Sequence, residues 1–548
     1  MASEAAFAYH EPSIKTVLNY TGFLLVLNIA NTCLDKLLYC GLIGQLFIGV
    51  LWGTPGAKWL DRETETVIQQ IGYLGLILLI YEGGLSTSIK ALKANILLST
   101  AVALTGVCAP MGLSFILMEL VSATPLQAFS AGAALSATSL GTTFTILSTT
   151  QLTTTRLGTV TTSAAMLDDV VGLVMVQIIS NLGGNSFDVV TVIRPVFVSL
   201  GFAIGLLLIC AFCLEPVLKK LIQHKERLPD IMGTAQFAFL AQTCVLVGIV
   251  TGATYAGTSS LFAAYLAGVI VSWFDGLVAE SKIQPIVSVP AVTQADSTAQ
   301  ETTSARRNSG NIAGHPDQPE SRSQQERHQH VTGEMVFERY YKEPNNRILL
   351  PLFFASIGFA IPITKMFTGQ IIWRGIIYAI LMAIGKMITG LWLVRFSSNP
   401  VSGLISTIKK PFIYAHSCTK PRTPKRSKKK SPSNPQGPTQ TDQTPANDSA
   451  PQLSLPPKPK SLYPSSILGL AMVARGEVGY LIASIAESQG IFSDGLSEGP
   501  SEIYLVVIWA ISLCTLIGPI LVGTLVKRVK KLQMSRDQGA DPLGVWGI

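Results

Sequence analysis

The sequence is poor in charged residues, and what it lacks excludes several classes of protein. Asp, Glu, Lys and Arg make up 14% of the 548 residues, whereas soluble domains contain about 25%. The net charge of +8 is not a nucleic-acid footprint, because most of the basic residues lie in loops and the C-terminal tail. The eight cysteines are scattered, mostly in apolar segments, so reduced structural thiols are expected. No GxxxxGK(S/T) motif is present, and we expect neither a cofactor nor enzymatic activity.

Long apolar runs are what the sequence has instead. Hydrophobic residues make up 48% of the chain, and its mean hydropathy is +0.42. A run of about 17 to 25 apolar residues can cross a bilayer as one helix, and hydropathy gives roughly thirteen such runs. They lie near residues 16–33, 36–53, 66–84, 94–119, 123–148, 157–181, 190–214, 230–252, 257–274, 347–364, 371–396, 463–488 and 502–526. The sequence therefore predicts an all-α polytopic membrane protein with about 13 transmembrane helices.

The distribution of basic residues predicts the orientation in the membrane. Lys90, Lys93 and Arg156 fall on one side, together with the basic residues of 219–227 and of the last segment. Loops rich in Lys and Arg face the cytoplasm. The N-terminus is therefore expected outside or in a lumen and the C-terminus in the cytoplasm, in either the plasma membrane or an endomembrane.

Two polar insertions divide the membrane domain. Residues 279–342 are rich in Ser, Gln and Thr, and residues 397–462 are rich in Pro, Ser and Lys. Neither has apolar periodicity, so both are predicted to be disordered and cytoplasmic. The predicted membrane domain consists of residues 1–278, 343–396 and 463–526, and a short cytoplasmic tail, 527–548, follows it.

Each insertion contains one short motif. Ser309 follows Arg-Arg-Asn, a pattern similar to a basophilic kinase site, where a phosphate would add charge to the loop. The Lys-rich residues 420–430 favour contact with anionic lipid, at about 1 kcal/mol per basic residue near the surface. The alternative for the second motif is a solvated tether.

Two adjacent carboxylates, Asp168 and Asp169, lie in the middle of the run 157–181. An ionised carboxylate at that depth costs about 2.5 to 3.5 kcal/mol on insertion scales, and two neighbouring carboxylates repel each other. Lys386 lies similarly deep in the run 371–396, where a lone lysine needs a carboxylate or loses its proton. We expect Lys386 to pair with one of the aspartates; the alternative is that helix tilt brings it to the interface.

The fifth and twelfth runs are predicted to break inside the membrane. Residues 134–145 are dense in Ser and Thr, and residues 469–480 contain Arg475, Glu477 and glycines. Unwound backbone in a bilayer is tolerated only where protein or a water-filled cavity satisfies it, and paired broken helices mark the ion site of secondary transporters. The matched positions predict two six-helix inverted repeats with crossed broken helices. The alternative is close packing of small residues.

Three further charged residues are candidates for supporting roles. Arg475 and Glu477 could pair across the second break and offset the dipoles of the helix ends. Glu82, at the end of the third run, could line a funnel or simply lie at the membrane interface. We expect charge compensation from the first two and leave both readings of Glu82 open.

Four segments of the chain carry a resemblance to a known family. They are residues 165–172 around the aspartate pair, residues 137–143 around Thr138, Pro351–Gly358, and residues 474–477. Together they resemble the monovalent cation:proton antiporter superfamily, the sodium/hydrogen exchanger family. The resemblance covers nearly all of the membrane portion, and the two insertions suggest a eukaryotic, fungal member.

The resemblance implies an architecture and a set of site residues. The family forms homodimers in which a mobile core unit contains the crossed helices. Asp169 would bind the cation and Asp168 would pair with Lys386, while Thr138 and Ser139 would offer oxygen ligands.

The stoichiometry stays open. Members with an Asp-Asp pair and a lysine are typically electrogenic. Ala164 stands where the electroneutral branch commonly has a glutamate, but the Tyr-Glu-Gly-Gly-Leu sequence around Glu82 is similar to that same branch.

The implied function is exchange of Na⁺ or K⁺ for protons by alternating access, in the service of cation and pH homeostasis, with Asp169 holding either ion. A cation channel or K⁺ efflux system is the alternative, although no TVGYG-like loop is present. An intramembrane aspartyl protease places its aspartates on two helices, whereas these are adjacent. Neighbours on a helix point about 100° apart, so both cannot easily face one scissile bond.

Overall fold

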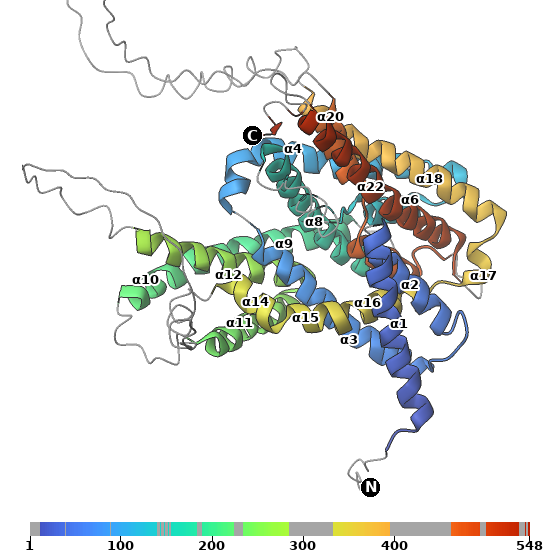
Figure 1. Ribbon diagram of the computed structural model, residues 1–548, viewed down its shortest axis with the longest axis horizontal. Coiled ribbons are helices and arrows are strands. Elements are labelled where there is room, and N and C mark those ends of the chain that lie inside the picture. Colours follow the sequence, from blue (N-terminus) through green and yellow to red (C-terminus); the bar gives the residue numbers. More distant parts are fainter. Residues whose placement is uncertain are drawn as a thin grey trace, which may run out of the picture.

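The computed structural model describes residues 11–38, 40–87, 89–139, 143, 147, 152, 155–183, 189–223, 234–283, 332–394, 462–493, 500–535, 543 and 546–547. Every regular element among these residues is helical (Figure 1). The first half contains α1 (Ile14–Leu38), α2 (Gly41–Trp52), α3 (Arg62–Leu85), α4 (Ile89–Ser114), α5 (Leu117–Leu120), α6 (Pro125–Ser136), α8 (Arg156–Leu182), α9 (Val189–Ile209), η1 (Cys210–Leu214), α10 (Glu215–Gln223), α11 (Ala235–Ala256) and α12 (Ser260–Ile283). The second half contains α14 (Gly333–Tyr340), α15 (Lys342–Pro344), η5 (Asn345–Leu349), α16 (Leu350–Phe359), α17 (Ile363–Met366), α18 (Gly369–Met387), η6 (Ile388–Leu393), α20 (Tyr463–Ala471), α21 (Glu477–Ser488) and α22 (Glu502–Ser535).

Nine of the described helices are long and apolar enough to cross a membrane. The all-helical polytopic fold is therefore confirmed, but the count of thirteen stays a prediction. The other four expected runs contain shorter helices in the described residues: α2, α6, α16, and the pair α20 and α21. Two of these four runs, those of α6 and of α20 with α21, are the ones in which a break was predicted.

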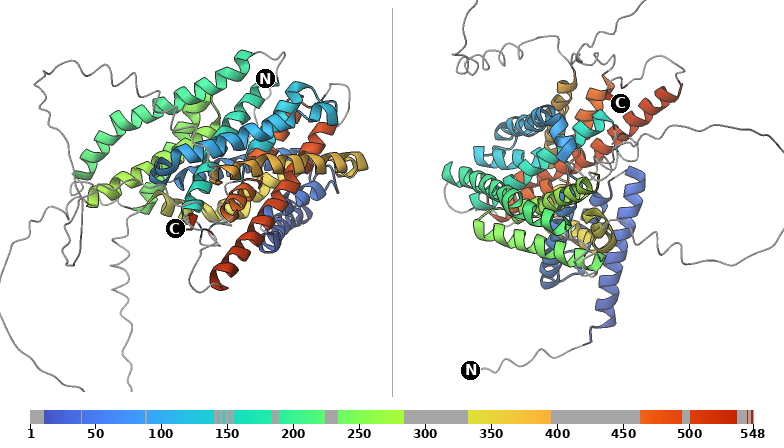
Figure 2. Two further views of the ribbon diagram at one scale, coloured as in Figure 1. Left: turned by 90° about the horizontal axis from the view of Figure 1, so that it is seen from above. Right: turned by 90° about the vertical axis from the view of Figure 1, so that its left-hand side faces the viewer.

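The long helices differ in how much of their surface is covered. In the apolar stretches of α1, α9 with η1, and α11, only 11% of the residues are buried within the protein. The corresponding share is 61% for α8 and 67% for α22. Figure 2 shows α1 at the edge of the helix bundle. α8 and α22 are thus central, whereas α1, α9 and α11 leave wide apolar faces for lipid or another protein chain.

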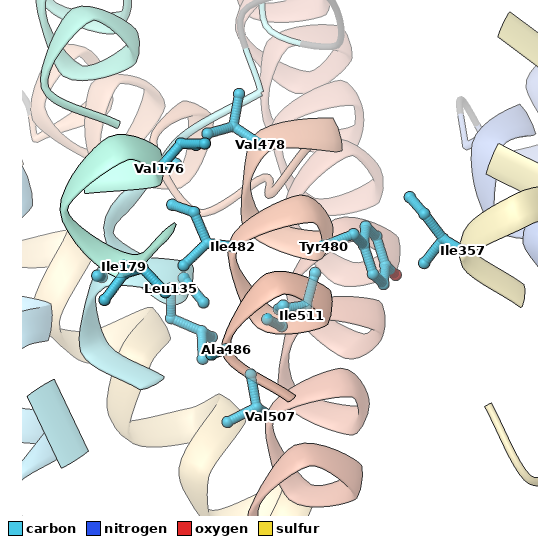
Figure 3. Packing of buried hydrophobic residues seen from close by; sticks show 14 of the residues in the cluster. Leu135, Val176, Ile179, Ile357, Val478, Tyr480, Ile482, Ala486, Val507 and Ile511 are labelled. Atoms are coloured by element: carbon cyan, nitrogen blue, oxygen red, sulfur yellow. The ribbon is translucent and has the colours of Figure 1, made fainter. Parts of the chain in front are cut away.

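The centre of the molecule is a dry core between α6, α8, α21 and α22. Figure 3 shows that Ile482 and Ala486 of α21 face Leu135 of α6 and Ile179 of α8, all of which are fully or almost fully buried. Val478, at the start of α21, lies beside Val176 of α8. This core fixes α21 against the two to three turns of α8 that follow the aspartate pair.

Small residues let other helices approach closely. A Cβ atom added to Gly268 of α12 would lie 2.7 Å from the backbone nitrogen of Leu85 in α3. Likewise, a Cβ atom on Gly49 of α2 would lie 2.7 Å from the Ala355 carbonyl carbon of α16. Backbone approach of this kind is the usual way in which membrane helices associate.

The prediction of disorder over residues 279–342 is wrong at both ends of that range. α12 continues to Ile283, and α14 begins at Gly333, where the Asp275 carboxylate accepts a hydrogen bond of 2.6 Å from the Gly333 nitrogen. Phe337 of α14 is buried against Tyr81, with ring centroids 6.1 Å apart. The remainder of this insertion, with Ser309, lies outside the described residues, as does the second insertion with residues 420–430.

The segment predicted as a short tail also contributes to the fold. α22 runs on to Ser535, and Leu543 and Trp546 are buried against the ends of α8, α20 and α22. The Arg156 guanidinium at the start of α8 lies 5.2 Å from the centre of the Trp546 ring. A cation over an indole ring is attractive by about 0.5 to 2 kcal/mol, so this contact holds the segment against α8.

Candidate functional site

Two interrupted helices cross at the centre of the molecule. α6 ends at Ser136, and the chain continues in extended form through Ala137 (φ −62°, ψ 135°). Residues 472–476 separate α20 from α21, and the Ser139 nitrogen donates a hydrogen bond of 2.9 Å to the Ala474 carbonyl. Both runs are therefore interrupted as predicted and meet at this hydrogen bond, while the two inverted repeats stay a prediction.

Arg475 satisfies the exposed backbone at this crossing. Its Nη1 atom donates to the carbonyl oxygens of Ser136, at 3.3 Å, and Ala137, at 3.2 Å. A helix end leaves carbonyls without partners and carries a partial negative charge, so a buried cation is favourable there. Gly476 allows the approach, because a Cβ atom at this position would lie 2.9 Å from the Cβ of Ser139.

The first aspartate of the pair is fully neutralised. The Lys386 ammonium lies 2.6 Å from Asp168 Oδ2 and donates a second hydrogen bond of 2.8 Å to Thr138 Oγ1. The Thr138 hydroxyl in turn donates to Asp168 Oδ2. The side chains of Asp168 and Lys386 are both 0% exposed. Asp168 and Lys386 together thus carry no net charge into the bilayer.

The second aspartate has a different environment, although it is the next residue of α8. Asp169 is 7% exposed, and among the described residues it forms no salt bridge, whereas Asp168 is paired with Lys386; the Oδ1 atoms of both aspartates lack a hydrogen-bond partner there. Adjacent helical residues point about 100° apart, so Asp169 turns away from Lys386 and faces a cavity. The pair therefore consists of one neutralised carboxylate and one available carboxylate.

Asp169 lines a cavity of 330 Å³ that also contains charged residues from distant parts of the sequence. Close to Asp169 in the sequence, Thr162, Met166 and Leu173 of α8 contribute to its wall. Its charged lining residues are Glu82 of α3, Asp169 of α8, Glu334 and Glu338 of α14, Lys342 of α15, and Glu477 of α21. Five carboxylates against one ammonium make this cavity attractive to cations.

The structure places the other predicted site residues as follows. Thr138 and Ser139 lie at the crossing but are not on the cavity wall, and the Thr138 hydroxyl is held between Asp168 and Lys386. The expected ion pair between Arg475 and Glu477 is not formed among the described residues. Arg475 instead binds carbonyl groups of the first broken helix, and Glu477 faces the cavity.

Sequence reasoning missed the contribution of α14 and α15. Glu334, Glu338 and Lys342 reach the cavity from a segment that was predicted to be disordered. The signal was local. Thr332 caps the helix through a hydrogen bond of 3.3 Å from the Met335 nitrogen, and Phe337 and Tyr341 lie one helical turn apart.

Nothing in the described residues suggests a resident metal cofactor. No group of three or more His, Cys, Asp or Glu side chains is placed to hold a metal ion there. Cys210 and Cys213 have C-x-x-C spacing, but both thiols are free, with one buried and the other exposed.

Comparison with known proteins agrees with this arrangement. The family model for the sodium/hydrogen exchanger transmembrane domain matches residues 23–290, a stretch that includes the aspartate pair. The high-affinity Na⁺/H⁺ antiporter NhaS3 of Synechocystis is 28% identical over 234 residues, which are 42% of this chain and 49% of that protein. These matches support the monovalent cation:proton antiporter superfamily. The Na⁺/H⁺ antiporter of Enterococcus hirae is 26% identical, over 42% of this chain and 58% of its own.

A solved structure extends the likeness to the remainder of the fold. The sodium proton antiporter MjNhaP1 of Methanocaldococcus jannaschii covers 94% of this chain and 99% of its own, with a TM-score of 0.50 and 12% identity. At that identity the likeness concerns the fold alone. The chain spans about half the length of the Synechocystis relative, and Lys386, Arg475 and Glu477 lie beyond the stretch matched by the family model.

Proposed function

We propose that the protein is a secondary antiporter that exchanges a monovalent cation, Na⁺ or K⁺, for protons by alternating access. The observation that carries the proposal is the environment of Asp169, a nearly buried carboxylate that lines an acidic cavity and forms no salt bridge among the described residues. The antiporter names of the relatives support it.

The two aspartates suggest how exchange is coupled. Lys386 and Arg475 offset two of the three carboxylates at the crossing, Asp168, Asp169 and Glu477, so one negative charge remains there when the site is empty. Moving that charge through a low-dielectric barrier is costly, whereas a protonated or cation-bound Asp169 is neutral. The site then changes its access only when loaded, and proton and cation compete for one carboxylate.

The assembly and location follow as parts of the same proposal. The protein would be a homodimer in a plasma membrane or endomembrane, with its N-terminus outside or lumenal and its C-terminus in the cytoplasm. The uncovered apolar faces of α1, α9 and α11 are compatible with a dimer interface or with lipid. The Lys-rich residues 420–430 would contact anionic lipid, Ser309 would be a phosphorylation site, and the two insertions point to a fungal source.

The test is transport by purified protein in liposomes with a trapped pH dye. Addition of Na⁺ or K⁺ should drive proton efflux from wild-type vesicles, and Asp169→Asn should abolish it. Glu119→Gln, which changes an exposed carboxylate outside the cavity, is the matched control. Setting the voltage with valinomycin distinguishes electrogenic from electroneutral exchange.

Three results would count against the proposal. Absence of exchange with either cation from folded wild-type protein would exclude an antiporter of Na⁺ or K⁺. Cation flux that is uncoupled from protons would instead identify a channel. Normal exchange by the Asp169→Asn variant would remove Asp169 from the ion site.

A further inference from the structure

The cavity has an inner and an outer set of charged residues. Asp169 and Glu477 come from the two helices at the crossing, α8 and α21. Glu334, Glu338 and Lys342 come from α14 and α15, and Glu82 comes from the end of α3. The outer group contains a basic side chain, because Lys342 Nζ lies 2.8 Å from Glu338 Oε1. Among the described residues, the inner pair of Asp169 and Glu477 forms no salt bridge with a basic side chain.

The position of Glu477 is fixed by the packing of its helix. Glu477 is the first residue of α21, and the next residue, Val478, packs against α8 beside Val176 (Figure 3). A Cβ atom added to Gly172 of α8 would lie 3.3 Å from a methyl group of Val478. Asp169, Gly172 and Val176 are three and four residues apart, so they share one face of α8. The first turn of α21 therefore lies on the face of α8 that carries Asp169.

The basic residues nearest in the crossing are committed elsewhere. Lys386 binds Asp168 and Thr138, and Arg475 donates to the Ser136 and Ala137 carbonyls. Glu477 makes no salt bridge with any residue that the structure describes. The position of Glu477 at the start of α21 is favourable in itself, because an acidic residue offsets the positive end of the helix dipole. That explanation accounts for an acidic side chain there but not for its place on the wall shared with Asp169.

Two unpaired carboxylates on one cavity wall repel each other, and a cation between them removes the repulsion. Small monovalent cations prefer oxygen ligands, and a second carboxylate raises the field that they experience. A site with higher field strength favours the smaller, more strongly hydrated ion. The geometry therefore bears on selectivity as well as on affinity.

We propose that Glu477 is a second carboxylate of the cation site and binds the transported ion together with Asp169. This inference rests on the proposed antiport function. It assigns to Glu477 a direct role in binding, in place of the charge-compensating role expected from the sequence. Asp169 remains the group at which proton and cation compete, while Glu477 sets the affinity and the order Li⁺, Na⁺, K⁺.

The test compares three substitutions in liposomes by measuring the apparent KM for Li⁺, Na⁺ and K⁺. Glu477→Gln should raise the Na⁺ KM by about tenfold to about a hundredfold and reduce the preference for Na⁺ over K⁺. Glu477→Asp retains the charge and should have an Na⁺ KM between those of wild type and Glu477→Gln, with a changed Na⁺/K⁺ ratio. Glu338→Gln removes a carboxylate from the outer group, and its effect should fade when choline chloride screens the cavity mouth.

Cation-dependent thermal stabilisation in detergent gives a second, transport-independent measurement. A ligand that binds only the folded state raises Tm with its concentration. Na⁺ and Li⁺ should raise the Tm of wild type, should have a much weaker effect on Glu477→Gln, and should have none on Asp169→Asn. The Tm without added cation reports separately whether each variant is folded.

The outcomes are distinguishable. If wild type exchanges cations for protons but Glu477→Gln keeps the wild-type KM and thermal shift, the assignment of Glu477 is wrong. The assignment is also wrong if Glu477→Gln and Glu338→Gln lose affinity equally and salt reverses both losses. If Glu477→Gln fails to fold, an unchanged Na⁺/K⁺ ratio in Glu477→Asp overturns the assignment. If wild type exchanges no ion, the proposed function fails first.

Discussion

Two of the carboxylate–lysine pairs among the described residues differ in almost everything except length. Asp168 and Lys386 meet at 2.6 Å with both side chains 0% exposed. Glu338 and Lys342 meet at 2.8 Å with side chains 56% and 40% exposed. A buried pair that loses one member leaves a charge without a partner, whereas an exposed pair loses little because water and salt replace the partner. Burial, and not distance, therefore decides how much stability is lost when one member of a pair is removed.

The largest expected effect comes from breaking the buried pair on one side. Lys386→Ala leaves Asp168 charged and fully buried, so it should destabilise the protein by about 3 to 5 kcal/mol and abolish exchange. Adding Asp168→Asn should recover most of the stability, because both charges are then absent. Unfolding of the purified variants in detergent measures this. A double variant no more stable than Lys386→Ala would show that the charge of Asp168 is not the cause.

Arg475 should rank next, because it binds backbone groups that no other described residue satisfies. Arg475→Met leaves the Ser136 and Ala137 carbonyls without that donor, at about 1 to 3 kcal/mol for each unsatisfied group. The control is Arg347→Met, an exposed arginine 3.3 Å from Glu343, which should change stability by less than about 0.5 kcal/mol. Equal losses of Tm in the two variants would contradict this account of the crossing.

Thr138 tests whether the hydroxyl within the buried pair matters. Thr138→Val keeps the shape but removes both the donor to Asp168 and the acceptor for Lys386, which should cost about 1 to 3 kcal/mol. Thr138→Ser retains the hydroxyl and should stay near wild type. Thermal unfolding of the two variants decides. A valine variant as stable as the serine variant would mean that the hydroxyl adds nothing.

The smallest effect is expected from the exposed pair. Lys342→Ala should change stability by no more than about 0.5 kcal/mol, and any change in cation KM should disappear at high salt. The hydrogen bond to Glu338 raises the pKa of Lys342 from its usual 10.5. A group whose pKa is raised by folding stabilises the folded state fully at pH values below its unfolded pKa. This stabilisation is lost only as the pH rises through the pKa of the folded state. The difference between variant and wild type should therefore be constant from about pH 5 to about pH 9, as urea titrations at several pH values would reveal.

Sequence reasoning predicted the buried pair more readily than the cavity. Asp168, Asp169 and Lys386 stand out because ionisable residues within apolar runs are rare and need partners. The interruption near Thr138 was predicted from the density of Ser and Thr together with the matched position of residues 469–480, although close helix packing gives the same composition. These features depend on local composition, which a single sequence contains in full.

The cavity wall depends on orientation, which composition does not contain. Arg475 and Glu477 are two residues apart, but Gly476 between them is extended (φ −131°, ψ −162°), so helical spacing does not predict where they point. Glu334 and Glu338 were hidden for another reason: the short helix α14 was averaged with a long polar segment. The Thr332 cap and the paired aromatic residues were the signals that a shorter window would have found.

The hydrogen bond from the Gly333 nitrogen to Asp275 also bears on how well insertions and deletions between α12 and α14 are tolerated. It holds the start of α14 against α12 at Asp275, eight residues before α12 ends at Ile283, so residues outside the intervening stretch 284–332 fix where it leaves α12 and where α14 begins. The entropy of closing a loop grows only with the logarithm of its length, and halving or doubling that length alters the free energy by about 0.6 kcal/mol. A change in the length of this segment should therefore cost little stability, while the carboxylates of α14 stay in place beside the cavity.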